Sequence, residues 1–233
     1  MSEKEPLILL VETATELCSV ALSYGGEILG EEISREPRSH ASLISVMTIK
    51  LMEKTGYTIP MCDAVAVSHG PGSYTGLRVG VSFAKGICYA VSKPLIAIGT
   101  LDIIAAMTAG TYALDNSSYI VPMIDARRME VYTATYDSKG KRIKDVEALV
   151  VKEDSFDRLL ESGELFFCGD GSVKVKPIIR HPNARFVEAE PLASNMSRIA
   201  TQIYKTKKFE DLAYFEPFYL KDFVATTPKN KII

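Results

Sequence analysis

The order of strand-like and helix-like segments constrains the fold of this chain most strongly. Near the start, "LILLVET" is an apolar run of the length of a buried strand. In "SVALSYGGEILGEEIS" two strands meet at Gly25 and Gly26. Paired glycines are favoured in two-residue hairpin turns because both positions adopt positive φ. A helix, a fourth strand ("AVAVSHG") and a second helix follow, so the first half is predicted to have the order βββαβα.

Local signals set the expected bounds of the two helices. Ser39 is a candidate N-cap for a helix over residues 40–55, which Gly56 would end. The second helix is expected over residues 77–92, before Pro94. The segment between residues 94 and 110 is interpreted as a bridge to the second half.

The second half repeats the order βββαβα without repeating the residues. Its predicted elements are strands in "SYIVPMIDA", "EVYTATYD" and "KDVEALVV", a helix in "KEDSFDRLLES", a strand in "ELFFCGDG" and a helix in "ASNMSRIATQIYKTKKF". We therefore predict an α/β fold with two lobes and mixed sheets, residues 1–100 and 101–233. This duplicated plan is that of actin, Hsp70 and the sugar kinases, and the plan alone does not confer their activity.

Composition sets limits on the class of protein. The 233 residues carry a net charge of -2, which gives no global attraction to nucleic acid. The amino terminus lacks the basic start of a signal peptide, and no apolar run reaches the roughly 18 residues that span a membrane. Four cysteines stand singly in apolar segments, which indicates reduced core thiols. We expect a cytoplasmic protein without membrane contact.

A nucleotide cleft is the first candidate site. In the actin plan, a turn after the first strand of each half clamps the phosphates; here these turns would hold Glu12 and Thr13, and Asp125. The first turn has no glycine, and Arg127 and Arg128 follow Asp125, although close approach of backbone amides to a phosphate is easiest at glycine. We predict a degenerate cleft, with an autonomous ATPase or kinase as the alternative.

The loop "HGPGSYTG" does not match a known catalytic or phosphate-binding pattern. Its GxGxxxG spacing is one residue longer than the dinucleotide fingerprint, and it lacks the lysine of a Walker A loop. A triad of Ser73, His69 and a carboxylate has no support from sequence beyond residue type. Metal sites on helices need two histidines one turn apart, and Ile44 stands one turn after His40. We expect no metal, and a metallopeptidase is the weakest alternative.

Small residues recur at every fourth position of the second predicted helix: Gly76, Gly80, Ala84 and Cys88. Residues four apart share one helix face, so this stripe lets another backbone come close. That backbone is either the protein's own sheet or a second helix. The preceding helix is apolar around more than one face, which favours the second reading and a two-helix docking face. Charges at Val46 and Ile49 would test it.

Several segments resemble the TsaB (YeaZ) family. They cover nearly the whole chain, and two of them, the glycine loop and "DARRMEVY", are specific. In order they are "VETAT", the helix after "RSHAS", "HGPGSYTGLRVGVSFAKG", "DARRMEVY", "GDG" and "EPFYLKD". Two departures are Glu12, where the group usually has Asp, and Lys221, where Arg is expected.

The resemblance implies an actin-like, non-catalytic subunit of the machinery that makes N6-threonylcarbamoyladenosine at position 37 of tRNA. It implies a TsaD-type catalytic partner, a TsaE-type ATPase, indirect contact with tRNA and a homodimer when the chain is alone. No tightly bound cofactor is implied, only a possible nucleotide at the interface of the complex. TsaD carries HxxxH on the matching helix, and the pair His40 and Ile44 implies loss of that metal site.

The resemblance also implies where the partner binds. In the family, the two helices of the first half pack against the matching helices of TsaD. Carried onto this chain, the contact residues would be Leu43, Met47, Leu51, Gly76, Arg78, Val79, Gly80 and Phe83.

Overall fold

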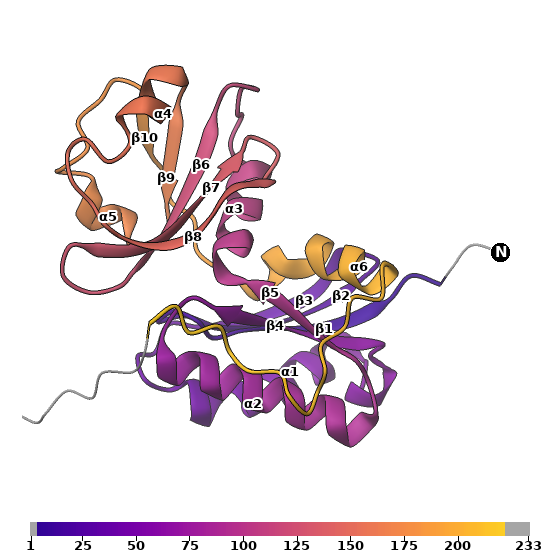
Figure 1. Cartoon of the computed structure of the whole chain (residues 1–233). Helices are drawn as coiled ribbons and strands as arrows, with labels where there is room; N and C mark the ends of the chain where they lie inside the picture. The colour runs from indigo at the N-terminus through magenta and orange to yellow at the C-terminus, as the bar shows by residue number, and fades with distance from the viewer. Residues whose placement is uncertain (1–3, 222–233) are drawn as a thin grey trace, which may run out of the picture.

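The computed structural model describes residues 4–221, which form two lobes, each built on a five-stranded sheet (Figure 1). The first sheet has the order β3-β2-β1-β4-β5. Its central strand β1 pairs antiparallel with β2 and parallel with β4. The bounds of its strands are β1 (Leu7–Glu12), β2 (Cys18–Tyr24), β3 (Glu27–Ser34), β4 (Ala64–Gly70) and β5 (Leu95–Gly99).

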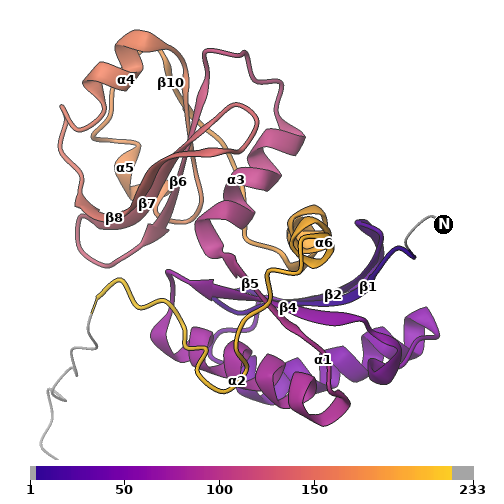
Figure 2. The same cartoon turned by 45° about the vertical axis from the view of Figure 1, so that its right-hand side comes forward.

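Helices cover both faces of the first sheet. On one face lie α1 (His40–Thr55) and α2 (Tyr74–Val91), with the short η1 (Ile59–Met61) between them in the chain. On the other lie α3 (Thr100–Thr111), η2 (Ala193–Met196) and α6 (Ser197–Lys205) (Figures 1 and 2). Because both faces are covered, β1 is buried along its whole length, as the apolar run "LILLV" requires.

The second sheet has the order β10-β9-β6-β7-β8 and shorter helices. One face packs against α4 (Asp157–Ser162) and α5 (Ser172–Val175), and the other packs against α3. The strands are β6 (Tyr119–Asp125), β7 (Glu130–Asp137), β8 (Arg142–Val150), β9 (Leu165–Cys168) and β10 (Ala184–Phe186). The strand orders of the two sheets correspond, which confirms the predicted duplicated actin-like plan.

Three segments differ from the sequence-based prediction. The bridge over residues 94–110 is a strand, β5, followed by helix α3. Strand β10 is an additional element that only three residues form, too few for a recognisable pattern. The helix expected within residues 193–209 begins with a 3-10 turn, η2, and α6 ends at Lys205.

The carboxyl-terminal part of the chain returns to the first lobe, although residues 101–233 were assigned to the second. Met196 and Ala200 are buried against the first sheet. The following segment, residues 206–221, runs along α2 and is called the strap (Figure 1). Its path is fixed by Glu210 N–H donating to Leu95 O at 3.0 Å and by Phe218 N–H donating to His69 O at 2.7 Å. The first lobe therefore contains residues from both ends of the chain, and the predicted division at residue 100 does not separate the two lobes.

Turn and cap chemistry explains the local bounds. Gly25 and Gly26 have φ of 59° and 94°, as the hairpin prediction requires, and Gly56 ends α1 with φ of 74°. Ser39 is the N-cap residue of α1, as predicted, but its hydroxyl donates to Glu36 O, so its side chain makes no capping hydrogen bond. Helix α2 begins earlier than predicted because Ser73 Oγ accepts from Gly76 N–H at 3.3 Å.

Among residues 4–221, no helix is both long and apolar enough to cross a membrane.

Candidate functional site

Helices α1 and α2 present an apolar outer face to solvent. Val46 and Ile49 of α1 are 58% and 57% exposed, and Tyr89 of α2 is 82% exposed. Leu43, Val79 and Phe83 are partly buried against the core beneath the helices. A contiguous exposed apolar patch marks an interaction surface, whereas single exposed apolar side chains are common on soluble proteins. We call Val46, Ile49 and Tyr89 the outer apolar face.

Two of the predicted contact residues lie on the opposite side of α1. Leu51 is fully buried and Met47 is 8% exposed, and both belong to the core between α1 and the first sheet. In this structure they are therefore core residues and not surface contacts. Sequence alone did not separate them from Val46 and Ile49, because α1 is apolar on both faces and its pattern does not identify the inner one. Arg78 is exposed beside the ring of Tyr74.

The glycine stripe of α2 packs against the protein's own turn after β1. A Cβ atom at Gly76 would lie 2.1 Å from the carbonyl oxygen of Thr13, and one at Gly80 would lie 2.1 Å from Thr13 Oγ1. Thr13 Oγ1 donates to Gly76 O at 2.8 Å. The interpretation that this stripe admits a helix of a partner is wrong. The small residues instead let the turn fit under α2, so Gly76 and Gly80 are not surface contacts.

The same packing closes the first half of the candidate nucleotide cleft. Glu12 and Thr13 are fully buried. Glu12 Oε1 accepts from Ala14 N–H at 2.5 Å, while Oε2 has no partner among the described residues. Burial raises the pKa of the Glu12 carboxyl to about 8, because the charged form loses its hydration. A buried and largely protonated carboxyl does not present a surface to phosphates.

The second half of the cleft is open. Asp125 ends β6 with its side chain half exposed and forms an ion pair with Lys174 of α5. Its Oδ1 also accepts from Arg127 N–H at 2.7 Å, and its own N–H donates to Asp170 Oδ1 at 3.1 Å. Glu12, Thr13 and Asp125 therefore do not form one site: two are sealed inside the first lobe and the third is tied into a hairpin of the second.

A cavity of about 310 Å³ lies between the lobes. Its polar wall includes His69 and Arg142, and its apolar wall includes Leu101, Val146 and Phe218 of the strap. Arg142 Nη2 donates to both carboxylate oxygens of Asp102, at 2.5 and 2.7 Å. Burial lowers the pKa of His69, which favours its neutral form. Because Asp102 neutralises Arg142, this cavity lacks a free cation for phosphate.

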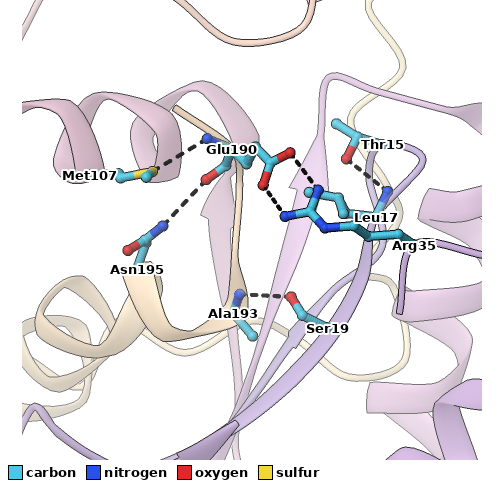
Figure 3. A network of polar contacts seen from close by, with 8 residues as sticks. All are labelled: Thr15, Leu17, Ser19, Arg35, Met107, Glu190, Ala193 and Asn195. Atoms are coloured by element: carbon cyan, nitrogen blue, oxygen red, sulfur yellow. Dashed lines mark hydrogen bonds and ion pairs between the residues drawn. The ribbon is translucent and has the colours of Figure 1, made fainter. Parts of the chain in front are cut away.

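A polar network joins the returning chain to the first lobe (Figure 3). Arg35, which follows β3, donates two bonds of 2.6 Å to the carboxylate of Glu190. Ala193 N–H donates to Ser19 Oγ at 2.9 Å, and Asn195 Nδ2 donates to Glu190 O at 3.3 Å. The network therefore attaches residues 190–195 to β2 and to the segment after β3, before α6 packs on the sheet.

His40 has a structural environment. Its Nε2 lies 3.1 Å from both Thr15 O and Leu17 O, so the ring links α1 to the loop after β1. Ile44, one turn later, is buried in the core. Within residues 4–221, no three His, Cys, Asp or Glu side chains lie together in a way that could hold a metal.

Comparison with known proteins identifies the family. A family model described as TsaD, tRNA N6-adenosine threonylcarbamoyltransferase, matches residues 21–217. The tRNA threonylcarbamoyladenosine biosynthesis protein TsaB of Escherichia coli (strain K12) is 31% identical over 94% of this chain and 96% of the relative. The chain belongs to the TsaB (YeaZ) family.

Two solved structures share the fold. YeaZ from Pseudomonas aeruginosa superposes with a TM-score of 0.76 at 25% identity, over 92% of this chain and 100% of that one. A second structure, described as similar to the peptidase YEAZ from Pseudomonas aeruginosa, gives a TM-score of 0.81 at 25% identity over 93% and 100%. As a member of the TsaB family, this chain belongs with proteins of tRNA threonylcarbamoyladenosine biosynthesis.

Two features of the TsaB-type structure were not singled out from the sequence. Tyr89 stands out only once the outer side of α2 is known, because "GICYAV" reads as uniformly apolar. The sequence showed only part of the strap, as the motif "EPFYLKD". In the structure the strap is attached to α2: Lys85 Nζ donates to Phe215 O at 2.9 Å, and the ring centroids of Tyr74 and Tyr219 lie 4.8 Å apart. Both depend on contacts between residues distant in sequence.

Proposed function

We propose that this chain is a non-catalytic subunit of tRNA threonylcarbamoyladenosine synthesis and binds a TsaD-type enzyme through α1 and α2. The observation that carries the proposal is the outer apolar face: Val46, Ile49 and Tyr89 are each more than half exposed on adjacent helices. Aromatic and aliphatic side chains of this kind form the dry centre of protein interfaces. The proposed contact also includes Leu43, Arg78, Val79 and Phe83, which are exposed or partly buried on the same two helices.

The absence of a catalytic role is supported by the sealed first turn. Glu12 and Thr13 are buried under α2, so nucleotide phosphates do not reach them in this conformation. The position where a second metal ligand would stand on α1 is Ile44, a core residue. We therefore propose that the chain activates its partner by favouring the competent conformation of that enzyme, through stronger binding to it.

The same face serves a second copy of the chain when the partner is absent. An exposed apolar face on an isolated subunit is covered by self-association when it is self-complementary about a two-fold axis. In the complex we propose a TsaE-type ATPase as a further partner. No cofactor is held tightly by this chain, and a nucleotide binds only at the interface of the subunits.

The test is co-purification with a TsaD-type enzyme, followed by a tRNA modification assay with and without this chain. We expect modification to require the chain. The double variant Val46→Asp/Ile49→Asp should weaken the complex at least 100-fold, because two charges would be buried at the interface. Isothermal titration gives the dissociation constant, and analytical ultracentrifugation follows the homodimer.

Val173→Asp/Ile143→Asp is the matched control, since these two apolar residues of the second lobe are 75% and 51% exposed. The control should bind the partner as the wild type does. Equal modification without the chain, or unchanged partner binding by Val46→Asp/Ile49→Asp, would show that the proposal is wrong. Turnover of ATP by the purified chain alone would instead support the autonomous ATPase.

A further inference from the structure

The hairpin that joins β6 and β7 holds two arginines in an unusual backbone conformation. Arg127 and Arg128 have φ of 70° and 50°, in the left-handed region that non-glycine residues rarely adopt. Strain of this kind persists only when the surrounding structure maintains it, and it is concentrated at functional positions. We call residues 125–130 the arginine hairpin.

Hydrogen bonds hold the backbone of the arginine hairpin in place. Ala126 N–H donates to Glu130 O at 3.1 Å, Glu130 N–H donates to Arg127 O at 3.2 Å, and Val151 N–H donates to Met129 O at 3.1 Å. Asp125 Oδ1 fixes Arg127 N–H at 2.7 Å. These bonds hold the backbone that carries the two exposed arginines.

Both arginine side chains are exposed and have no hydrogen-bond or ion-pair partner within residues 4–221. The two carboxylates within the hairpin itself are already paired: Asp125 pairs with Lys174, and Glu130 pairs with Lys221 of the strap. The base of the hairpin thus carries two balanced ion pairs, and its tip carries two uncompensated positive charges. The tip is suited to an external anion.

We propose that the arginine hairpin contacts the phosphodiester backbone of tRNA. The proposal rests on the proposed function, which brings tRNA to the complex. Arginine remains charged at all physiological pH values, and its planar fork matches the oxygens of a phosphate. The second lobe would then take part in RNA binding although the chain as a whole is slightly acidic.

RNA fits this tip better than an acidic protein surface does. A stable protein interface covers about 800 Å² on each partner and about 20–30 residues, whereas the arginine hairpin is a narrow projection with two charges. Phosphate contacts need no such area, because each arginine neutralises one phosphate and releases its counterions. Binding to an acidic protein surface is therefore the alternative outcome of the test.

The test measures binding of a tRNA transcript with adenosine at position 37, to the chain alone and to its complex with a TsaD-type enzyme. Binding is followed by fluorescence anisotropy from 50 to 200 mM salt. We expect Arg127→Ala/Arg128→Ala to weaken RNA binding about ten-fold and to reduce the slope of log K against log salt by about 2. Affinity for the TsaD-type enzyme should stay unchanged.

A matched control removes two positive charges at the other end of β7. Lys139 and Lys141 are exposed in the β7–β8 turn, and Lys139→Ala/Lys141→Ala should leave both the RNA affinity and the salt slope near the wild-type values. A second variant, Arg127→Gly/Arg128→Gly, should raise the thermal midpoint, because glycine accepts positive φ, and still lose RNA binding. Loss of RNA binding with a more stable fold excludes unfolding as its cause.

Three results would overturn the inference: RNA binding unaffected by the arginine variants, an equal loss in the lysine control, or no measurable RNA binding by either the chain or the complex. A fourth result, loss of affinity for the TsaD-type enzyme with RNA binding retained, would assign the hairpin to a protein interface instead. Failure of the complex to form contradicts the proposed function, and the RNA measurement on the chain alone still tests the hairpin.

Discussion

The ends of the first strands of the two lobes, β1 and β6, occupy equivalent places in the duplicated plan but have opposite environments. Glu12 ends β1 and is fully buried with a raised pKa. Asp125 ends β6, is half exposed and pairs with Lys174. The helices that pack on the two turns differ in length. Helix α2 has 18 residues and covers the first turn, whereas α5 has 4 residues and leaves Asp125 half exposed.

This difference shows how one plan supplies two kinds of surface. In the first lobe, long helices bury the turn and present the outer apolar face, with Val46 and Ile49 exposed. In the second lobe the helices are short, and Arg127 and Arg128 of the arginine hairpin are exposed. The two equivalent turns therefore differ in exposure, and the two lobes present different surfaces to solvent.

The largest effect that we expect concerns Glu12. Its pKa is about 8 in the folded protein and near 4.5 when unfolded, so the folded state binds the proton more tightly. This contribution to stability is fully present below about pH 4.5 and is lost as the pH rises towards 8. Relative to Glu12→Gln, the wild type should lose about 1.4 kcal/mol for each pH unit within this window.

Chemical denaturation of both proteins at pH 5, 6, 7 and 8 measures that difference. Glu12→Gln keeps the oxygen that accepts from Ala14 N–H and stays neutral throughout, so it should be the more stable protein at pH 8. A constant difference across the four pH values would contradict the buried, protonated carboxyl and would remove the contrast with Asp125.

A smaller effect is expected at the glycines of α2. Gly76→Ala places a methyl group against the carbonyl of Thr13, and displacing the turn should destabilise the protein by roughly 1–3 kcal/mol. Gly86→Ala is the matched control on the same helix, since no atom lies within 4 Å of its Cβ position and the residue is exposed. The control should be more stable than wild type by about 0.5–1 kcal/mol.

Urea denaturation distinguishes the two alanine variants. Opposite signs of the change in unfolding free energy would confirm that α2 seals the first turn. If Gly76→Ala were as stable as Gly86→Ala, the close contact between α2 and Thr13 would not be the reason for the glycine stripe.

The smallest effect is expected for Asp125→Asn. The ion pair with Lys174 is partly exposed, and such pairs contribute about 0–1 kcal/mol, while asparagine keeps an acceptor for Arg127 N–H. The unfolding free energy at pH 7 should therefore change by less than about 1 kcal/mol. A loss of several kcal/mol would show that the second turn is as tightly built as the first, against the comparison of the two lobes.

The pattern of the sequence predicted the order of the elements well, because it depends on short-range periodicity. The buried run of β1, the Gly25-Gly26 turn and the end of α1 at Gly56 follow from local propensities and φ preferences. The segment "HGPGSYTGLRVG" was recognised as a tight turn before a helix with one small face. The pattern also excluded the known phosphate-loop fingerprints, since these depend on spacing.

Which surface each residue occupies was decided by the tertiary structure. Leu51 and Val46 have similar local patterns, but only packing on the sheet makes one core and the other solvent-exposed. The stripe of Gly76 and Gly80 required a close neighbour, and only the fold shows that this neighbour is Thr13. Sequence thus determined that a backbone must approach α2. The fold determined which one, because contacts between residues more than sixty positions apart depend on how the sheet, the helices and the turn pack together.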